Sequence, residues 1–188
     1  ALKWQASADA LGDRFEFDPN PRRDSLLQLI ASDEPLGITD DTQMTLFGLE
    51  ALLNTRAQDN PYCTLTLKAN LKAGYTSWLR TQEYPAPEPT AKGVASYPEM
   101  YASRAPGNTC LSSVAAKFLV RNNSKGCGAV MRALPFVLFP TSTEAELDAA
   151  LTHHHPEVGT TAKAQHAYMR TLLLGEPLAE TAKDAPFS

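Results

Sequence analysis

The chain has 188 residues, of which 43% are hydrophobic and 20% are charged, and its formal net charge is −4. This length and composition predict one soluble globular domain spanning residues 1–188, while the acidic balance and scattered Lys and Arg argue against nucleic-acid binding. No apolar run reaches the roughly 20 residues that a membrane span needs. Cys63, Cys110 and Cys127 lack the spacing of a disulfide scaffold or zinc knuckle, and the start of the chain lacks a signal-peptide pattern. We therefore expect reduced thiols in a cytoplasmic protein.

The strongest helical pattern covers residues 38–58. Apolar residues recur there in two rows, which predicts a helix buried in an all-α core. The rows are Met44, Phe47, Ala51 and Leu52, and Leu46, Leu49 and Leu53. Asp40 and Asp41 lie at the predicted start, where carboxylates complement the positive end of the helix dipole. A second helix is predicted over residues 64–81, with apolar positions Leu67, Leu71, Tyr75, Trp78 and Leu79.

The region after the second helix begins with prolines at positions 85, 87 and 89, which predict a long loop ending at about Gly107. Helical spacing resumes with Leu111, Val114, Ala115 and Phe118. The apolar run over residues 131–139 is short enough to be helix or strand.

Two further helices are predicted near the C-terminus. Thr141 and Glu144 have the spacing of a capping box for a helix through Leu151. The last helix is expected from about Pro156 to Leu174, followed by an irregular tail. Its predicted core positions are Ala164, Ala167, Tyr168 and Leu172.

The polar segment Thr39-Asp40-Asp41-Thr42 carries the clearest chemistry in the sequence. Two adjacent carboxylates flanked by hydroxyls offer several oxygen ligands of the kind that Mg²⁺ and Mn²⁺ prefer. The alternative is an ordinary helix start, in which Thr39 caps the helix and the aspartates complement its dipole. On these residues alone the capping interpretation is favoured, because caps are far commoner than metal sites.

Other polar residues suggest weaker candidates. Glu16 lies between Phe15 and Phe17, where partial desolvation would suit it to bind metal or transfer a proton, although a surface position on a loop explains it equally simply. The glycine-containing turns at residues 107–109 and 122–128 could direct backbone N–H groups toward a diphosphate, or could be ordinary turns. Three adjacent histidines, His153, His154 and His155, do not have zinc-site spacing, but one of them could bind a phosphate or ribose oxygen.

Taken in order along the chain, these elements resemble the ADP-ribosylglycohydrolase family. The resemblance covers nearly the whole chain and is carried by residues 9–12 with Glu16, 38–44, Tyr75 with Trp78, 104–111, 123–132 and 152–156. Several motifs in the family's order are more specific than any one of them. The resemblance therefore favours the metal interpretation of Asp40 and Asp41 over the capping interpretation.

The resemblance implies an all-α fold, a compact orthogonal bundle of helices around a cleft that holds two divalent ions, Mg²⁺ or Mn²⁺. It implies that Thr39, Asp40 and Asp41 bind metal and that Glu16 or Asp41 acts in catalysis. The implied substrate-binding residues are Gly107, Asn108, Thr109, Ser124, Gly126, Cys127, Gly128 and His153. The implied activity is hydrolysis of the C1″ glycosidic bond that links ADP-ribose to a protein side chain, most simply arginine. An ADP-ribosylated protein or a small ADP-ribose conjugate is the implied partner.

Two departures from the family pattern qualify this expectation. Ala8 stands where the family has the first glycine of its GDALG segment, and the second metal motif, Asp-x-Asp-Thr, is absent from these residues. We therefore expect a domain truncated at its C-terminus, completed by a missing segment or a second chain, or a shortened relative. The competing hypotheses are an active hydrolase, an ADP-ribose-binding relative without turnover, and a non-enzymatic scaffold.

Overall fold

The computed structural model describes residues 1–60 and 62–175 of the chain. These residues form α-helices and short 3₁₀ segments without a strand, which confirms the predicted all-α fold class. The helices are α1 (Leu2–Gly12), α2 (Arg23–Ala31), α3 (Asp40–Arg56), α4 (Thr64–Glu83), α5 (Asn108–Ala115), α6 (Thr143–Thr152) and α7 (Pro156–Leu174). The 3₁₀ segments are η1 (Asp13–Phe15), η2 (Gly93–Ser96), η3 (Pro98–Met100), η4 (Cys127–Ala129) and η5 (Leu134–Leu138). The irregular tail predicted after the last helix falls on residues 176–188, outside the described residues.

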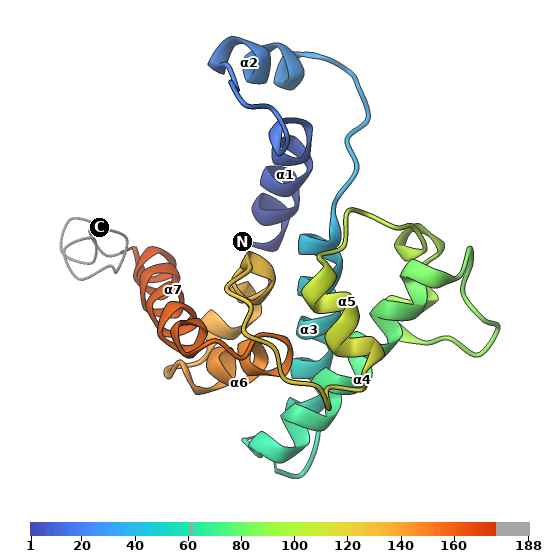
Figure 1. Cartoon of the computed structure of the whole chain (residues 1–188), viewed down its shortest axis with the longest axis vertical. Coiled ribbons are helices and arrows are strands. Elements are labelled where there is room, and N and C mark those ends of the chain that lie inside the picture. Colours follow the sequence, from blue (N-terminus) through green and yellow to red (C-terminus); the bar gives the residue numbers. More distant parts are fainter. Residues whose placement is uncertain (61, 176–188) are drawn as a thin grey trace.

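Helices α3 and α4 pack against each other at the centre of the molecule (Figure 1). Gly74 on α4 permits their close approach, since a Cβ there would lie 3.1 Å from the Phe47 carbonyl oxygen of α3. The first predicted row of α3 is buried, as are most predicted apolar positions of α4: Met44, Phe47, Ala51, Leu52, Leu67, Leu71, Tyr75 and Trp78. The prediction that both rows of α3 are buried is wrong at Leu53, whose side chain is 59% exposed.

Helix α5 corrects the prediction for the middle of the chain. It starts at Asn108, directly after the predicted loop, and it ends at Ala115. Phe118 packs against the core from outside the helix, because Lys117 and Phe118 adopt positive φ angles of 55° and 61° that a right-handed helix excludes. The apolar run after the second glycine-containing turn becomes the 3₁₀ segment η5.

The C-terminal helix pair α6 and α7 packs together beside η5. The predicted capping box of α6 is wrong, because Ser142 precedes the helix and no side chain caps it. Helix α7 has the predicted bounds, but three of its four predicted core positions are wrong: Ala167, Tyr168 and Leu172 are exposed, while Ala164 is partly buried. The buried residues of α7 are instead Val158, Ala162 and His166.

Helices α1 and α2 extend from the rest of the molecule at its N-terminal end (Figure 1). They have little apolar packing, since α1 buries Ala10 and α2 buries no residue. Polar contacts hold α1 in place: the Gln5 Nε2 donates to Thr45 Oγ1 of α3 at 2.8 Å and to the Met131 carbonyl at 2.9 Å, and Asp9 accepts hydrogen bonds from Thr39 and Thr42. Among the described helices, none combines the length and the apolar character that crossing a membrane requires.

Candidate active-site pocket

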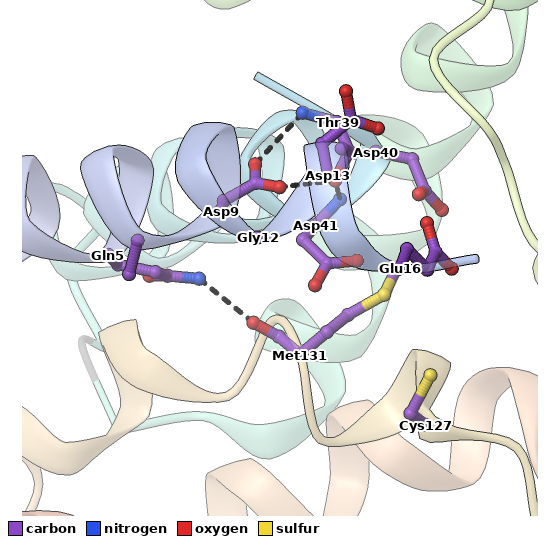
Figure 2. Close-up of a pocket in the computed structure, with 11 residues that line it drawn as sticks. Gln5, Asp9, Gly12, Asp13, Glu16, Thr39, Asp40, Asp41, Cys127 and Met131 are labelled. Carbon is purple, nitrogen blue, oxygen red and sulfur yellow. Dashed lines mark hydrogen bonds between the residues drawn. The ribbon is translucent and has the colours of Figure 1, made fainter. Parts of the chain in front are cut away.

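A pocket of about 470 Å³ opens between α1, the start of α3 and the η4 turn (Figure 2). Its carboxylates come from two parts of the chain, and none of the described Lys, Arg or His residues lines it. It is lined by Gln5, Ala8, Asp9, Gly12, Asp13, Glu16, Thr39, Asp40, Asp41, Cys127 and Met131. The structure therefore brings together the predicted metal ligands, the predicted catalytic Glu16 and one predicted substrate-binding residue, Cys127, in a pocket of strongly negative potential.

The start of α3 is capped as the simpler sequence interpretation predicted. The Thr39 hydroxyl oxygen accepts a hydrogen bond from the Asp41 N–H at 3.2 Å, so Thr39 is the N-cap residue. The backbone of Asp40 is held by the Arg104 carbonyl, which accepts the Asp40 N–H at 2.9 Å. The cap leaves both aspartate side chains available on the pocket wall, so capping and ion binding are compatible at this segment.

Burial and mutual repulsion raise the pKa values of the two adjacent aspartates. Burial raises the pKa of Asp40 to about 7, with added repulsion from Asp41 and Asp9, although a hydrogen bond from the Gly107 N–H opposes the shift. Burial likewise raises the pKa of Asp41 to about 6, and the negative charges of Asp9 and Glu16 add to the effect. Both carboxyl groups are therefore harder to ionise than an ordinary aspartate, and a positive charge placed near them would oppose this shift.

Glu16 follows η1 and reaches the same pocket from the α1 side (Figure 2). The expected partial desolvation is wrong, because Glu16 is exposed and Phe17 beside it is 84% exposed. Glu16 thus faces solvent at the rim of the pocket.

The two glycine-containing turns lie next to each other. The Thr109 hydroxyl donates to Ser124 Oγ at 3.0 Å, and Ser124 Oγ also accepts the Gly126 N–H at 3.2 Å. The first turn meets the pocket through Gly107, whose N–H donates to Asp40 Oδ2 at 3.3 Å. Asn108, the first residue of α5, is exposed. These contacts place the predicted substrate-binding turns beside the acidic pocket.

His153 lies beneath the second turn rather than on its surface. The side chain is 2% exposed, and its Nδ1 lies 2.9 Å from Thr152 Oγ1. Burial lowers the pKa of His153 to about 4, with the charge of Arg132 and the neighbouring His154 adding to the effect. The neutral imidazole packs against Gly126 and Gly128 on the inner side of the turn. Any contact with a ligand would therefore be made by these glycines rather than by the imidazole.

Gly128 is the position in this turn that has no room for a side chain. A Cβ at Gly128 would lie 2.5 Å from Cys110 Sγ and 2.9 Å from His153 Cε1, both in buried side chains. We expect Gly128→Ala to destabilise the protein by about 1–3 kcal/mol, as overpacking of a filled interior does. Gly107→Ala is the matched control: no atom lies within 4 Å of its Cβ position, so its effect should stay within about 0.5 kcal/mol. Urea unfolding followed by circular dichroism measures both, and equal stabilities would contradict the close packing at Gly128.

The residues fit a hydrated divalent ion better than a fully protein-ligated one. Within residues 1–60 and 62–175, no group of three or more His, Cys, Asp or Glu side chains converges as a metal cluster. Mg²⁺ usually keeps several water ligands and binds proteins through one or two carboxylates. Asp40 and Asp41, with the Thr39 hydroxyl, supply oxygen donors of that kind, so the chemistry of the donor set fits Mg²⁺ or Mn²⁺.

Sequence reasoning missed three polar residues that line the pocket: Gln5, Asp9 and Asp13. Together with Glu16 they form a polar stripe along one side of α1 and η1, at the spacing of successive helical turns. The spacing of these four residues is a signal that the sequence carries. However, the segment has no apolar stripe on its opposite side, so its sequence does not show the pattern by which an amphipathic helix is predicted.

Comparison with known proteins identifies the family. The profile of the ADP-ribosylglycohydrolase family matches residues 5–186, which is nearly the whole chain and includes both the pocket and the glycine-containing turns. Searches of curated proteins and of solved structures gave no significant match. With its all-α fold and the family motifs in order along the sequence, the chain belongs to the ADP-ribosylglycohydrolase family.

Proposed function

We propose that this chain is a metal-dependent hydrolase that releases ADP-ribose from a modified protein side chain, most simply arginine, by cleaving the glycosidic bond at C1″. The family match supports the general activity. The observation that carries the metal dependence is the pair of neighbouring aspartates with raised pKa values in a pocket lined by carboxylates and by no basic side chain. Such a pocket attracts cations and repels the anionic diphosphate unless a cation is bound.

Thr39, Asp40 and Asp41 would hold the ion on the protein side, with Mg²⁺ or Mn²⁺ as the ion and two ions in the complete family site. When bound, divalent ions supply positive charge that orients ribose hydroxyls and activates water. The family's second motif is absent from this sequence, so further ligands would come from water, substrate or another segment. We therefore expect this chain alone to bind the ion weakly.

The protein's own carboxylates would carry the proton transfer. Asp41 has a pKa of about 6, so it can exchange a proton near neutral pH, and Glu16 lies exposed at the rim of the same pocket. The negative charge of the pocket would also stabilise the oxocarbenium-like character that develops when a glycosidic bond breaks. The turns at residues 107–109 and 124–128 would hold the diphosphate through backbone N–H groups, at a distance from the bond that breaks.

Hydrolysis of ADP-ribosyl-arginine in the presence of Mg²⁺ tests the proposal. We expect release of ADP-ribose that requires Mg²⁺ and stops when a chelator removes it. Glu16→Gln should lower kcat by roughly 10²–10⁴-fold if Glu16 is the proton-transfer group. The control is Glu157→Gln, because Glu157 is an exposed carboxylate paired with Lys125 and does not line the pocket. Mg²⁺-dependent turnover that Glu16→Gln leaves unchanged would assign proton transfer to Asp41 instead.

The second candidate function is ADP-ribose binding without turnover. It is favoured by the lack of a three-ligand metal cluster in the described part of the chain. ADP-ribose binding measured by calorimetry, with no release of ADP-ribose from the conjugate, would support this function. Neither binding nor turnover would leave a helical scaffold as the remaining hypothesis.

A further inference from the structure

Asp9 differs from the other carboxylates of the pocket because it is directed at the protein itself. Its Oδ1 accepts the Thr39 hydroxyl at 2.6 Å, and its Oδ2 accepts the Thr39 N–H at 2.9 Å. The same Oδ2 accepts the Thr42 hydroxyl at 2.5 Å and the Thr42 N–H at 3.3 Å. All of these donors belong to the start of α3, whereas Asp9 lies on α1. Figure 2 shows the Asp9 carboxylate directed at Thr39.

These contacts occupy most of the hydrogen-bonding capacity of Asp9. Its Oδ2 accepts three of the four donors, and its Oδ1 accepts the Thr39 hydroxyl. Each carboxylate oxygen offers about two lone-pair sites, so Oδ2 is fully used and Oδ1 keeps one. Asp9 is therefore directed mainly at Thr39 and Thr42, which suits it to orient them.

Asp9 also supplies the cap that the first residues of α3 would otherwise need from their own side chains. The first N–H groups of a helix have no partner within the helix. Asp9 accepts the Thr42 N–H, and Thr39 accepts the Asp41 N–H. Neither Asp40 nor Asp41 is needed as a cap, and within the described residues the Asp41 carboxylate accepts no hydrogen bond. The carboxylate of Asp41 lies on the Met131 side of the pocket, away from Asp9 (Figure 2).

The bond from Thr39 to Asp9 determines where the hydroxyl proton of Thr39 points. A carboxylate only accepts hydrogen bonds, so the single hydroxyl proton of Thr39 must be directed to Asp9. One lone pair of Thr39 Oγ1 accepts the Asp41 N–H, which leaves one further lone pair on a side chain that lines the pocket. A hydroxyl oxygen binds a cation through a lone pair, so this orientation is the one that an ion requires.

We infer that Asp9 is a positioning residue of the proposed ion site: it takes the hydroxyl proton of Thr39 and caps α3 in place of Asp40 and Asp41, so that all three keep lone pairs for a cation. This inference rests on the proposed function. It assigns Asp9 the role that carboxylates behind metal ligands have in many proteins, where they orient the ligand and increase its basicity.

Binding of Mn²⁺ alone, measured by the loss of the electron paramagnetic resonance of the free ion, tests the inference without substrate. Asp9→Asn should weaken Mn²⁺ binding about 10–100-fold, because the amide offers N–H donors where Thr39 and Thr42 also donate. Asp13→Asn is the matched control, since Asp13 lines the same pocket and its replacement removes the same charge. Both variants lose one negative charge, so the additional loss of Mn²⁺ affinity in Asp9→Asn measures the effect of positioning separately from the effect of charge.

A second variant keeps every charge in place. Thr42→Val removes the 2.5 Å hydrogen bond to Asp9 without touching a residue that lines the pocket, and it should weaken Mn²⁺ binding by less than about tenfold. Circular dichroism shows whether each variant is folded. If Asp9→Asn does not fold, the Mn²⁺ affinity of Thr42→Val tests the inference in its place. A double-mutant cycle that combines Asp9→Asn with Thr39→Val adds a further criterion. The double variant should lose little more Mn²⁺ affinity than the weaker-binding of the two single variants, because Asp9 acts through Thr39.

The outcomes separate the inference from the proposed function. If the unaltered chain does not bind Mn²⁺, the metal-dependent function is wrong and the inference fails with it. If the unaltered chain binds Mn²⁺ but Asp9→Asn binds it as well as Asp13→Asn does, and Thr42→Val binds it unchanged, the inference alone is wrong. Excess loss with Asp9→Asn, or with Thr42→Val where that variant decides, supports it.

Discussion

Replacing Asp40 and Asp41 together with asparagine is expected to make the ion-free protein more stable above pH 7 and, if the proposed ion site is correct, to remove the stabilisation that Mg²⁺ gives the unaltered chain. The pKa of Asp40 is raised to about 7 and that of Asp41 to about 6, from an ordinary value of 3.8, with burial as the main cause. Between about pH 4 and pH 7 the folded state therefore holds more protons than the unfolded state. By linkage, the stability of the unaltered chain falls as the pH rises through this range.

The expected gain in stability is about 2–4 kcal/mol at pH 8, since a full pKa unit corresponds to about 1.4 kcal/mol and the partly exposed Asp41 is screened by solvent. Loss of the favourable interaction between the aspartates and the helix dipole opposes the gain by about 0.3–1 kcal/mol for each residue. The double variant should keep its helical circular dichroism, because Thr39 and Asp9 cap α3. Any Mg²⁺-dependent turnover should disappear.

Urea unfolding with and without Mg²⁺, repeated from pH 4 to pH 8, measures both effects. A control variant with Asp33→Asn and Asp59→Asn removes two exposed carboxylates elsewhere and should change neither the pH profile nor the response to Mg²⁺. If the Asp40 and Asp41 variant lost helix content, the aspartates would serve mainly to start α3. If it kept its stabilisation by Mg²⁺, the ion would bind elsewhere.

The helices that are predictable from sequence are those with an apolar side and local end signals. Helix α7 has Pro156 in its first turn and ends at Gly175, whose φ of 73° is the left-handed conformation that glycine favours. Its bounds follow from these two residues. Helix α2 buries no residue and α1 buries one, so neither shows the apolar period by which helices are recognised.

The prediction of which side of α7 faces the core is wrong for a different reason. Apolar residues occur on more than one side of this helix, so the sequence offers two similar stripes. The choice depends on contacts with a distant segment: Gln165 donates to the Val130 carbonyl and Arg170 donates to the Phe139 carbonyl. These bonds turn His166 inward and leave Tyr168 37% exposed. Such long-range hydrogen bonds leave no periodic trace in the sequence.

The site was predictable in part for the same reason. Asp40 and Asp41 are adjacent and form a local motif, but these residues alone favour a helix cap, and the resemblance of the whole chain to the family is what favours an ion site. Asp9 acts on residues 30 and 33 positions further along the chain, and its partners are known only once α1 packs against α3. Candidate ligands can thus be read from a local pattern, whereas the residues that would orient them require the fold.

Replacing Asp148 with asparagine is expected to destabilise the protein by about 3–5 kcal/mol, because it leaves the charge of Arg132 buried without a counter-charge. Arg132 and Asp148 are 0% and 1% exposed, and the Arg132 Nε donates to Asp148 Oδ2 at 2.8 Å. Tyr75 donates to the other oxygen of Asp148 at 2.6 Å. With a total stability of roughly 5–15 kcal/mol for a typical domain, a loss of this size approaches unfolding.

The exposed pair of Lys125 and Glu157 provides the control for this prediction. Its side chains are 58% and 66% exposed, so Glu157→Gln should cost no more than about 1 kcal/mol. Replacing both members of the buried pair by Arg132→Met and Asp148→Leu should recover much of the loss, since no charge is then left buried. Urea unfolding gives all three values, and a cost for Asp148→Asn as small as that for Glu157→Gln would show that water reaches Arg132.

The buried pair also bears on the site, because Arg132 donates to the Gly128 carbonyl in the turn above it. The same guanidinium donates to Thr152 Oγ1 at 2.9 Å, next to His153. A loss of the Asp148 charge should therefore weaken ADP-ribose binding, if the turn binds the diphosphate, under conditions where the variant is still folded. Since neither Arg132 nor Asp148 lines the acidic pocket, Mn²⁺ binding by the folded variant should change little. If the variant lost the binding of ADP-ribose and of Mn²⁺ together, the pocket and the turn would instead unfold as one unit.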